Sequence, residues 1–150
     1  MRFTIKWIKS YKDIPLETRK KAHIDRKDNL VALADDDGII YAIKGKATEA
    51  SVLHEMFHLI KKHPTKPRDP KTFVLQELQA HMYGYSQLKK PRHLIGELRA
   101  NFNDLCFNVY KCSSKDALTA MHDSLVKVKA PPTWMSDYNR LVKEVKEAER

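Results

Sequence analysis

The periodicity of the apolar residues changes once along this chain, at Gly45. Before that residue, short runs alternate or stay apolar as β-strands do, over residues 2–8, 30–34 and 38–43. After it, apolar residues recur at helical spacing, and Pro or Gly interrupts the pattern. The predicted helices there cover about 48–62, 71–88, 92–111, 115–128 and 133–149. Strands first and helices afterwards are typical of an α+β fold.

The N-terminal part of the chain predicts a small antiparallel sheet. The run Asp35-Asp36-Asp37-Gly38 separates two apolar stretches, and an Asp-Gly pair in that position is typical of a hairpin turn. A short helix is expected over 14–24, beginning near Pro15. Glycine is scarce, with 4 residues in 150, which favours a helix-rich fold over a sandwich or barrel. We expect a single domain over 1–150, with a core at about 1–90 and a helical extension at about 92–150.

The motif His54-Glu55-Met56-Phe57-His58 lies inside the first long predicted helix. Histidines four residues apart project from one face, so His54 and His58 can bind one tetrahedral zinc ion. Glu55 lies about 100° round the helix, where it can reach a water held by the metal without binding the metal itself. The apolar neighbours of the motif predict a largely buried helix, in which these polar side chains need partners. The alternative is a pair of hydrogen-bonded core histidines beside a surface glutamate.

A third metal ligand is expected on the next predicted helix. Glu77 follows His58 after 18 residues, a separation that fits a helix end, a tight loop and an antiparallel return helix. Ala80 and Gly84 share its stripe, and their small size would let the two helices approach closely. His81 lies on the same face, either as a rival ligand or as a group that supports the ligands or the transition state. Glu77 could otherwise be a solvated helix residue.

These residues resemble a known group of enzymes. The motif, the 18-residue interval and Glu77 together resemble the gluzincin signature, the class that includes thermolysin. The stretch Glu77-Leu78-Gln79-Ala80 is also similar to the Glu-x-x-Ala stretch of the compact ImmA/IrrE-type metallopeptidases and of the minigluzincins. The resemblance covers about residues 30–90. A metzincin is excluded, because it would need Gly at 61 and His at 64, where this chain has Lys61 and Pro64.

The resemblance implies a zincin-like fold and a zinc-dependent peptidase. In such families a small sheet precedes the active-site helix, and its edge strand lines the substrate cleft. Residues 38–43 would then be that edge strand and would pair with an extended peptide. Glu55 would act as the general base. The oxyanion donor would be a Tyr or a His, with His81 and Tyr83 as the first candidates; Tyr85 and His93 also stay open.

The net charge of +9 motivates a second hypothesis. Basic residues follow each of the two metal helices (Lys61, Lys62, His63, Lys66, Arg68 and Lys71; Lys89, Lys90 and Arg92). They either contact an acidic partner or nucleic acid, or they are helix C-terminal cations and a solvated loop, which is the interpretation we favour. The alternative function is a basic nucleic-acid-associated regulatory module whose zinc site is structural or vestigial. A peptidase acting on a DNA-bound regulator would combine both.

The cysteines and the hydropathy predict the compartment. Cys106 and Cys112 lie six residues apart in one predicted helix and form no CxxC pair, so we expect reduced thiols. The N-terminal residues lack the apolar segment of a signal peptide, and no apolar run approaches the roughly 20 residues of a membrane span. We therefore expect a cytoplasmic protein with a peptide or protein substrate and no membrane partner. The sequence does not fix the oligomeric state.

Overall fold

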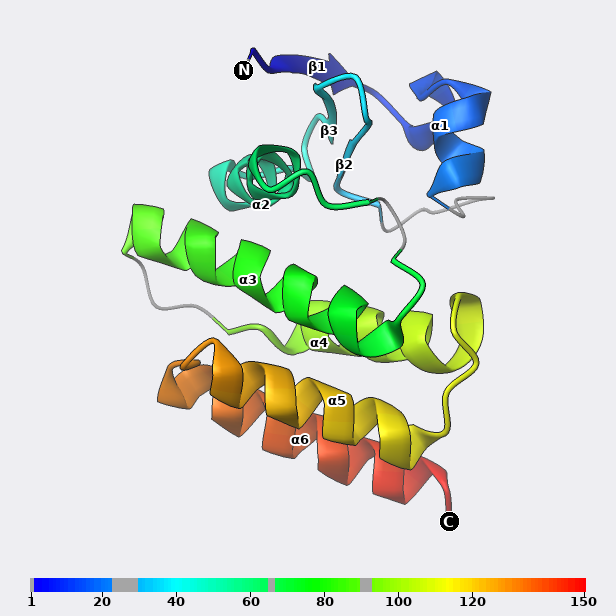
Figure 1. The fold of residues 1–150 in the computed structure, drawn as a ribbon, viewed down its shortest axis with the longest axis vertical. Helices are drawn as coiled ribbons and strands as arrows, with labels where there is room; N and C mark the ends of the chain where they lie inside the picture. The colour runs from blue at the N-terminus through cyan, green and yellow to red at the C-terminus, as the bar shows by residue number, and fades with distance from the viewer. Residues whose placement is uncertain (1, 23–29, 65–66, 90–92) are drawn as a thin grey trace. The chain divides into compact units, whose positions relative to one another are not determined.

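The structure, a computed structural model, describes residues 2–22, 30–64, 67–89 and 93–150. Within these residues it is an α+β fold, with a three-stranded mixed sheet and six α-helices (Figure 1). The chain divides into two compact units: unit 1 comprises residues 1–67 and 83–88, and unit 2 comprises residues 68–82 and 89–150. The expectation of one catalytic domain, with a core at about 1–90 and a helical extension at about 92–150, concerns function and stays a prediction.

Unit 1 contains the sheet, in which the predicted hairpin is confirmed. The strands are β1 (Thr4–Ile8), β2 (Ala32–Ala34) and β3 (Ile39–Ile43). In the turn between β2 and β3, the Asp35 carboxylate accepts hydrogen bonds from the backbone N–H groups of Asp37 (2.9 Å) and Ile39 (3.1 Å). Gly38 has a φ of 81°, and a Cβ there would lie 3.1 Å from the carbonyl oxygen of Arg2. The turn therefore needs glycine at this position.

Two predictions about the sheet are wrong. β1 runs parallel to β3, so the sheet is mixed and not antiparallel. Residues 38–43, expected to be the edge strand, form the central strand in the order β1-β3-β2, so that β1 and β2 are the edges. The turn sequence specifies the hairpin locally, whereas β1 pairs with a distant part of the chain, Thr4 with Ile39. No local pattern sets the direction of such a pair.

Two short helices follow β1. They are η1 (Tyr11–Asp13), a 3₁₀ turn capped by Ser10, and α1 (Leu16–Lys21), which begins after Pro15 as predicted. The predicted end of this helix, 23–24, lies outside the described residues. Ile14, between the two helices, is 2% exposed and belongs with Ile40, Ala42 and Ile43 to the buried residues of unit 1.

The motif helix α2 (Glu49–Ile60) begins where the sequence predicts it. Thr48 is the N-cap: its hydroxyl accepts from the Ser51 N–H, and the Ser51 hydroxyl accepts from the Thr48 N–H. α2 contacts β2 and β3 (Figure 1). The prediction of a largely buried helix is wrong, because residues 51–59 are all half-buried and Ile60 is 45% exposed. Apolar residues lie all round this helix, whereas a sheet can cover only one side of it.

The third helix, α3 (Pro70–Leu88), is continuous and contributes to both units. It starts at the Asp69-Pro70 pair, where the Asp69 carboxylate accepts from the Thr72 hydroxyl at 2.9 Å and from the Thr72 N–H at 3.3 Å. These hydrogen bonds, that of the Thr72 side chain foremost, lower the pKa of Asp69. Its end at Leu88 agrees with the prediction.

The remaining helices belong to unit 2. They are α4 (Ile95–Asn103), continued by a π-helical turn η2 (Asp104–Asn108), α5 (Ser114–Lys127) and α6 (Pro132–Ala148). α6 packs on α4 and on α5 (Figure 1). The core of the unit contains fully buried side chains from all three (Leu94, Leu98, Leu105, Met121, Leu125 and Trp134). None of the described helices combines the length and the apolar character that crossing a membrane requires.

The two cysteines do not share a helix, which corrects that prediction. Cys106 is buried within η2, whereas Cys112 follows the end of this turn and donates its backbone N–H to the carbonyl of Leu105 at 2.8 Å. Both are free thiols, and burial raises the pKa of each. The π-helical turn ends the helix earlier than the predicted boundary at 111, so the chain between the cysteines is not helical throughout.

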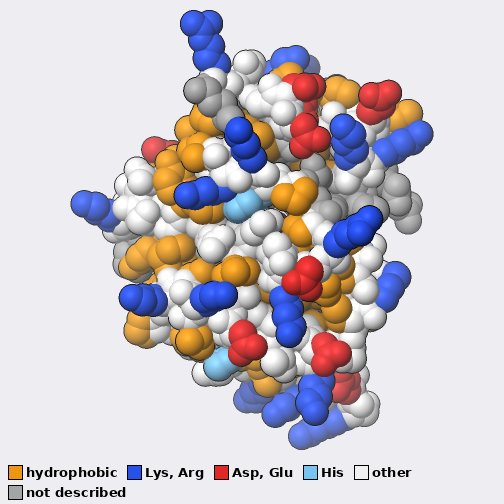
Figure 2. All heavy atoms as spheres, viewed as in Figure 1, with side chains coloured by type: hydrophobic (Ala, Val, Ile, Leu, Met, Phe, Trp, Pro, Cys, Tyr) orange, Lys and Arg blue, Asp and Glu red, His pale blue; other side chains and the backbone are white. Residues whose placement is uncertain are grey.

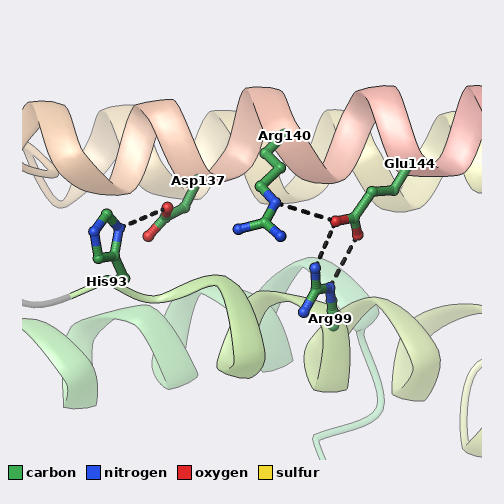
Figure 3. A network of polar contacts seen from close by, with 5 residues as sticks. All are labelled: His93, Arg99, Asp137, Arg140 and Glu144. Carbon is green, nitrogen blue, oxygen red and sulfur yellow. Dashed lines mark hydrogen bonds and ion pairs between the residues drawn. The ribbon is translucent and has the colours of Figure 1, made fainter.

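Polar contacts join α6 to α4 (Figure 3). The carboxylate of Asp137, a residue only 4% exposed, accepts from the Leu94 N–H at 2.6 Å, where α4 begins, and lies 3.0 Å from Nδ1 of His93. Two turns further along α6, Glu144 accepts from Arg99 and also contacts Arg140 at 3.3 Å. The hydrogen bond from Arg99 lowers the pKa of Glu144 and raises that of Arg99. The start of α4 therefore depends on a carboxylate supplied by α6.

Lysines adopt a left-handed backbone conformation after several helix ends. Among the described residues, the non-glycine residues with positive φ are Lys62, Lys89, Lys111 and Lys129, with φ between 53° and 59°. Each follows a helix end within three residues. This left-handed conformation normally favours glycine, which is scarce here, and a cation after a helix C-terminus interacts favourably with the helix dipole.

These positions favour the interpretation that some of the basic residues are helix C-terminal cations. Lys62 and Lys89 belong to the two basic runs, whereas Lys66, Lys90 and Arg92 lie outside the described residues. On the face drawn in Figure 2, Lys and Arg side chains are scattered among hydrophobic and acidic ones.

Candidate metal centre

The two histidines of the motif turn their imidazoles toward each other. Nε2 of His54 lies 3.1 Å from Nε2 of His58, and the rings meet edge to face, with 4.7 Å between centroids. The i, i+4 spacing on α2 brings both to one face. Two nitrogens that bind one tetrahedral zinc ion at 2.0–2.1 Å lie about 3.3 Å apart. The observed separation therefore matches what a shared metal ion would need.

Glu77 completes a group of three metal-ligating side chains. One ligand atom from each of His54, His58 and Glu77 lies within 4.8 Å of the other two, and all three residues are half-buried. All three lie in the part of the chain that the structure describes. Two imidazole nitrogens and one carboxylate oxygen form a donor set that suits zinc and other divalent transition metals. The group is therefore compatible with a bound metal ion.

The last turns of α3 lie against α2. The ring of Tyr83 stacks on that of Phe57, with centroids 5.3 Å apart. Gly84 is buried, and a Cβ added there would lie 3.7 Å from the carbonyl oxygen of Ala50, an ordinary contact distance. The predicted close approach at Gly84 is therefore confirmed, although the space would also accept an alanine.

The other predicted site residues lie on the same two helices, with one exception. Glu55 on α2 and His81, Tyr83 and Tyr85 on α3 are all half-buried, and Tyr83 is stacked as described. His93 lies in unit 2, where its side chain is 76% exposed and paired with Asp137. The roles of Glu55, His81 and Tyr83 in catalysis stay predictions.

Two residues beside the predicted ligands were not anticipated. His63 places its Nδ1 3.0 Å from Nδ1 of His58, the nitrogen that faces away from His54. The second is Tyr110, whose pKa is raised to about 12, first by burial, then by the negative charge of Asp104 and then by that of Glu77. His63 lies five residues after His58, a spacing that does not share a helix face, so helical periodicity could not find it. Nothing local in the sequence connects Tyr110 to Glu77.

The chain was compared with protein-family models, with curated proteins and with solved structures, and no match was found in any of the three.

Proposed function

We propose that this chain is a zinc-dependent peptidase of the gluzincin type. Its metal would be held by His54, His58 and Glu77, and Glu55 would be the general base. The observation that carries the proposal is the convergence of the three ligand atoms within 4.8 Å on half-buried side chains. The motif and its spacing support the same assignment, because they place Glu55 beside the ligands without making it one.

The number of ligands favours a catalytic site over a structural one. A structural zinc site is closed by four protein ligands, whereas a catalytic site has three and leaves one position for water or substrate. In the part of the chain that the structure describes, the group contains three residues. His63 does not close it, because its Nδ1 faces the opposite nitrogen of His58. The basic module with a structural zinc site would need a fourth ligand.

Glu55 would move the proton in the reaction. A bound zinc ion would supply a Lewis acid that lowers the pKa of water toward about 7 and polarises the peptide carbonyl. The Glu55 carboxylate would accept the proton of the attacking water and then deliver it to the leaving nitrogen. His81 or Tyr83, both on α3, would donate a hydrogen bond to the oxyanion.

The substrate we propose is an extended peptide that adds to the edge of β2. The backbone N–H of Asp35 donates to the carbonyl of Ile39, and the carbonyl of Val31 accepts from the N–H of Ile43. Since the backbone groups of alternate residues point to the same side of a strand, those of Val31, Leu33 and Asp35 face β3. The N–H and C=O groups of Ala32 and Ala34 then face the outer edge, where a peptide can pair with them. β2 also contacts α2, the helix that carries the motif.

We expect the reaction in the cytoplasm, where the free thiols of this chain stay reduced.

Metal content tests the ligand assignment. We expect about one zinc per chain in the purified wild type and loss of zinc in both His58→Ala and Glu77→Ala. His81→Ala is the matched control on α3 and should retain the metal. Zinc lost in His81→Ala but kept in Glu77→Ala would move the third ligand to His81. A wild type that neither contains nor takes up zinc would contradict the proposal.

Peptide hydrolysis tests the mechanism. Glu55→Gln should retain zinc, because Glu55 is not a ligand, and should lose hydrolysis of a peptide library by at least about 100-fold. His54→Ala should lose both zinc and hydrolysis. Hydrolysis by Glu55→Gln at the wild-type rate would exclude the general-base role.

A further inference from the structure

The end of α2 places a third histidine against the metal pair. His58 faces His54 through Nε2 and faces His63 through Nδ1, at 3.1 Å and 3.0 Å. The His58 and His63 rings meet at 64°, with 5.2 Å between centroids. All three histidines belong to unit 1. His58 is therefore the central member of a row of three imidazoles.

A helix-ending motif produces this contact. The N–H of His63 donates to the carbonyl of His58 at 2.9 Å, and the N–H of Lys62 donates to that of Leu59 at 3.1 Å. Lys62 is left-handed, with a φ of 54°. These are the two hydrogen bonds of the Schellman motif, in which the side chains of the two residues joined by the longer bond come together. That pair is frequently apolar, whereas here it is His63 and His58.

The contact fixes the roles of the ring nitrogens. A histidine that binds a metal through Nε2 is neutral and carries its proton on Nδ1. His58 Nδ1–H would then donate to Nδ1 of His63, which must be the acceptor and carry its own proton on Nε2. The imidazole of His63 is half-buried and contacts the ring of Phe57, with 5.7 Å between centroids, so its orientation is restrained. This histidine can therefore hold both the tautomer and the angle of the His58 ring.

We propose that His63 is a positioning residue for the metal ligand His58. This inference rests on the proposed metal centre and adds a member to it. Hydrogen bonds from ligand imidazoles to a second residue set ring orientation and ligand basicity, and losing one typically weakens metal binding by 10–100-fold. Because the proton of His58 is then on Nδ1, Nε2 of His54 must donate to Nε2 of His58 when no metal is bound. His58 is therefore already in the tautomer that binds a metal through Nε2, whereas His54 must move its proton to Nδ1 when the metal binds.

Two substitutions separate positioning from packing. His63→Leu provides an apolar residue, which the Schellman motif normally has at this position, but it removes the hydrogen-bond acceptor. His63→Asn keeps an acceptor near the position of Nδ1. Zinc affinity would be measured by competition with a chelating dye, and the stability of the metal-free proteins by thermal unfolding. We expect His63→Leu to weaken zinc binding about 10–100-fold at unchanged or higher metal-free stability, and His63→Asn to recover most of the affinity.

The outcomes distinguish this inference from the proposed function. A wild type that binds no zinc would overturn both. Zinc binding by His63→Leu at wild-type affinity would overturn the positioning role and leave the metal centre intact, as would a His63→Asn variant that binds no better than His63→Leu. If His63→Leu does not fold, ¹⁵N NMR of the histidine rings in the zinc-loaded wild type decides. Binding of the metal to Nε2 of His58, with a proton on its Nδ1, supports the role, and binding to Nδ1 excludes it.

Discussion

The ring of Tyr83 lies on the ring of Phe57, with 5.3 Å between centroids and 37° between planes. The pair joins the last turns of α3 to the motif helix α2 within unit 1. Aromatic pairs of this kind contribute about 0.5–1.5 kcal/mol beyond the area they bury. The same tyrosine is a candidate oxyanion donor, so the packing role of its ring and the role of its hydroxyl need separate tests.

Substitution of Tyr83 separates these two roles. Tyr83→Phe should leave the free energy of unfolding within about 0.5 kcal/mol of the wild type, because the ring stays in place, whereas Tyr83→Ala should lower it by about 2 kcal/mol. Chemical denaturation measures both. Zinc content should be unchanged in Tyr83→Phe. A loss of hydrolysis in this variant at normal stability would assign the oxyanion role to the hydroxyl, and full activity would move it to His81.

Glycine at position 62 should stabilise the protein. Lys62 has a φ of 54°, a conformation that costs a residue with a Cβ about 1 kcal/mol. We therefore expect Lys62→Gly to raise the free energy of unfolding by about 0.5–1 kcal/mol and to keep the zinc affinity, since the His63 contact depends on the backbone alone. Lys129→Gly, at the equivalent end of α5, is the matched control with the same expected gain. A destabilised Lys62→Gly variant would contradict the described helix end.

Removal of the Asp137 carboxylate should destabilise unit 2. It is buried and accepts the N–H of Leu94, so Asp137→Ala leaves a buried donor without its charged acceptor. We expect a loss of about 2–3 kcal/mol in the free energy of unfolding, measured by urea denaturation. His93→Ala removes only the exposed partner and should cost less than about 1 kcal/mol. Equal losses in both variants would show that the contact between His93 and Asp137, and not the hydrogen bond at the start of α4, is responsible for the stabilisation.

Alkaline pH should lower the free energy of unfolding, in part through ionisation of Tyr138. The hydroxyl of this 8% exposed residue donates to the carbonyl of Leu118 at 2.8 Å, and burial raises its pKa above the ordinary value of 10. The unfolded state then loses this proton at lower pH than the folded state, so stability is full below pH 10 and falls as the pH rises above it. Tyr138→Phe should therefore show a smaller decrease in denaturation midpoint between pH 9 and pH 11 than the wild type.

At neutral pH the same substitution should cost about 1 kcal/mol, because the Leu118 carbonyl loses its donor. If Tyr138→Phe and the wild type lose equal stability between pH 9 and pH 11, another group must be responsible for the alkaline effect.

The features that the sequence predicted well are those set by neighbouring residues. His54 and His58 meet because helical geometry brings residues four apart to one face, and the hairpin forms because Gly38 provides the required turn. The direction of β1 and the central position of β3 were not predictable, since both depend on a pairing between Thr4 and Ile39 that has no local signal.

His63 was missed for a related reason. Its contact with His58 depends on Lys62 adopting a left-handed conformation, and a lysine gives no sign of that in the sequence. A glycine at this position would have indicated the helix end, and with it the pairing of the residues on either side. The interaction of Glu77 with the phenol of Tyr110 is likewise set by tertiary structure and by nothing nearby in the chain.

The division of α3 between the two units has a consequence for how the protein is made. Residues 83–88 complete unit 1, but residues 68–82, which precede them, belong to unit 2. A nascent chain that has emerged only as far as Pro67 therefore lacks the partner of Phe57 and must wait for the whole of α3. The N-terminal unit therefore cannot be completed before residues 83–88 have been synthesised, and a protease that cuts between residues 67 and 68 would break the covalent link between its two segments.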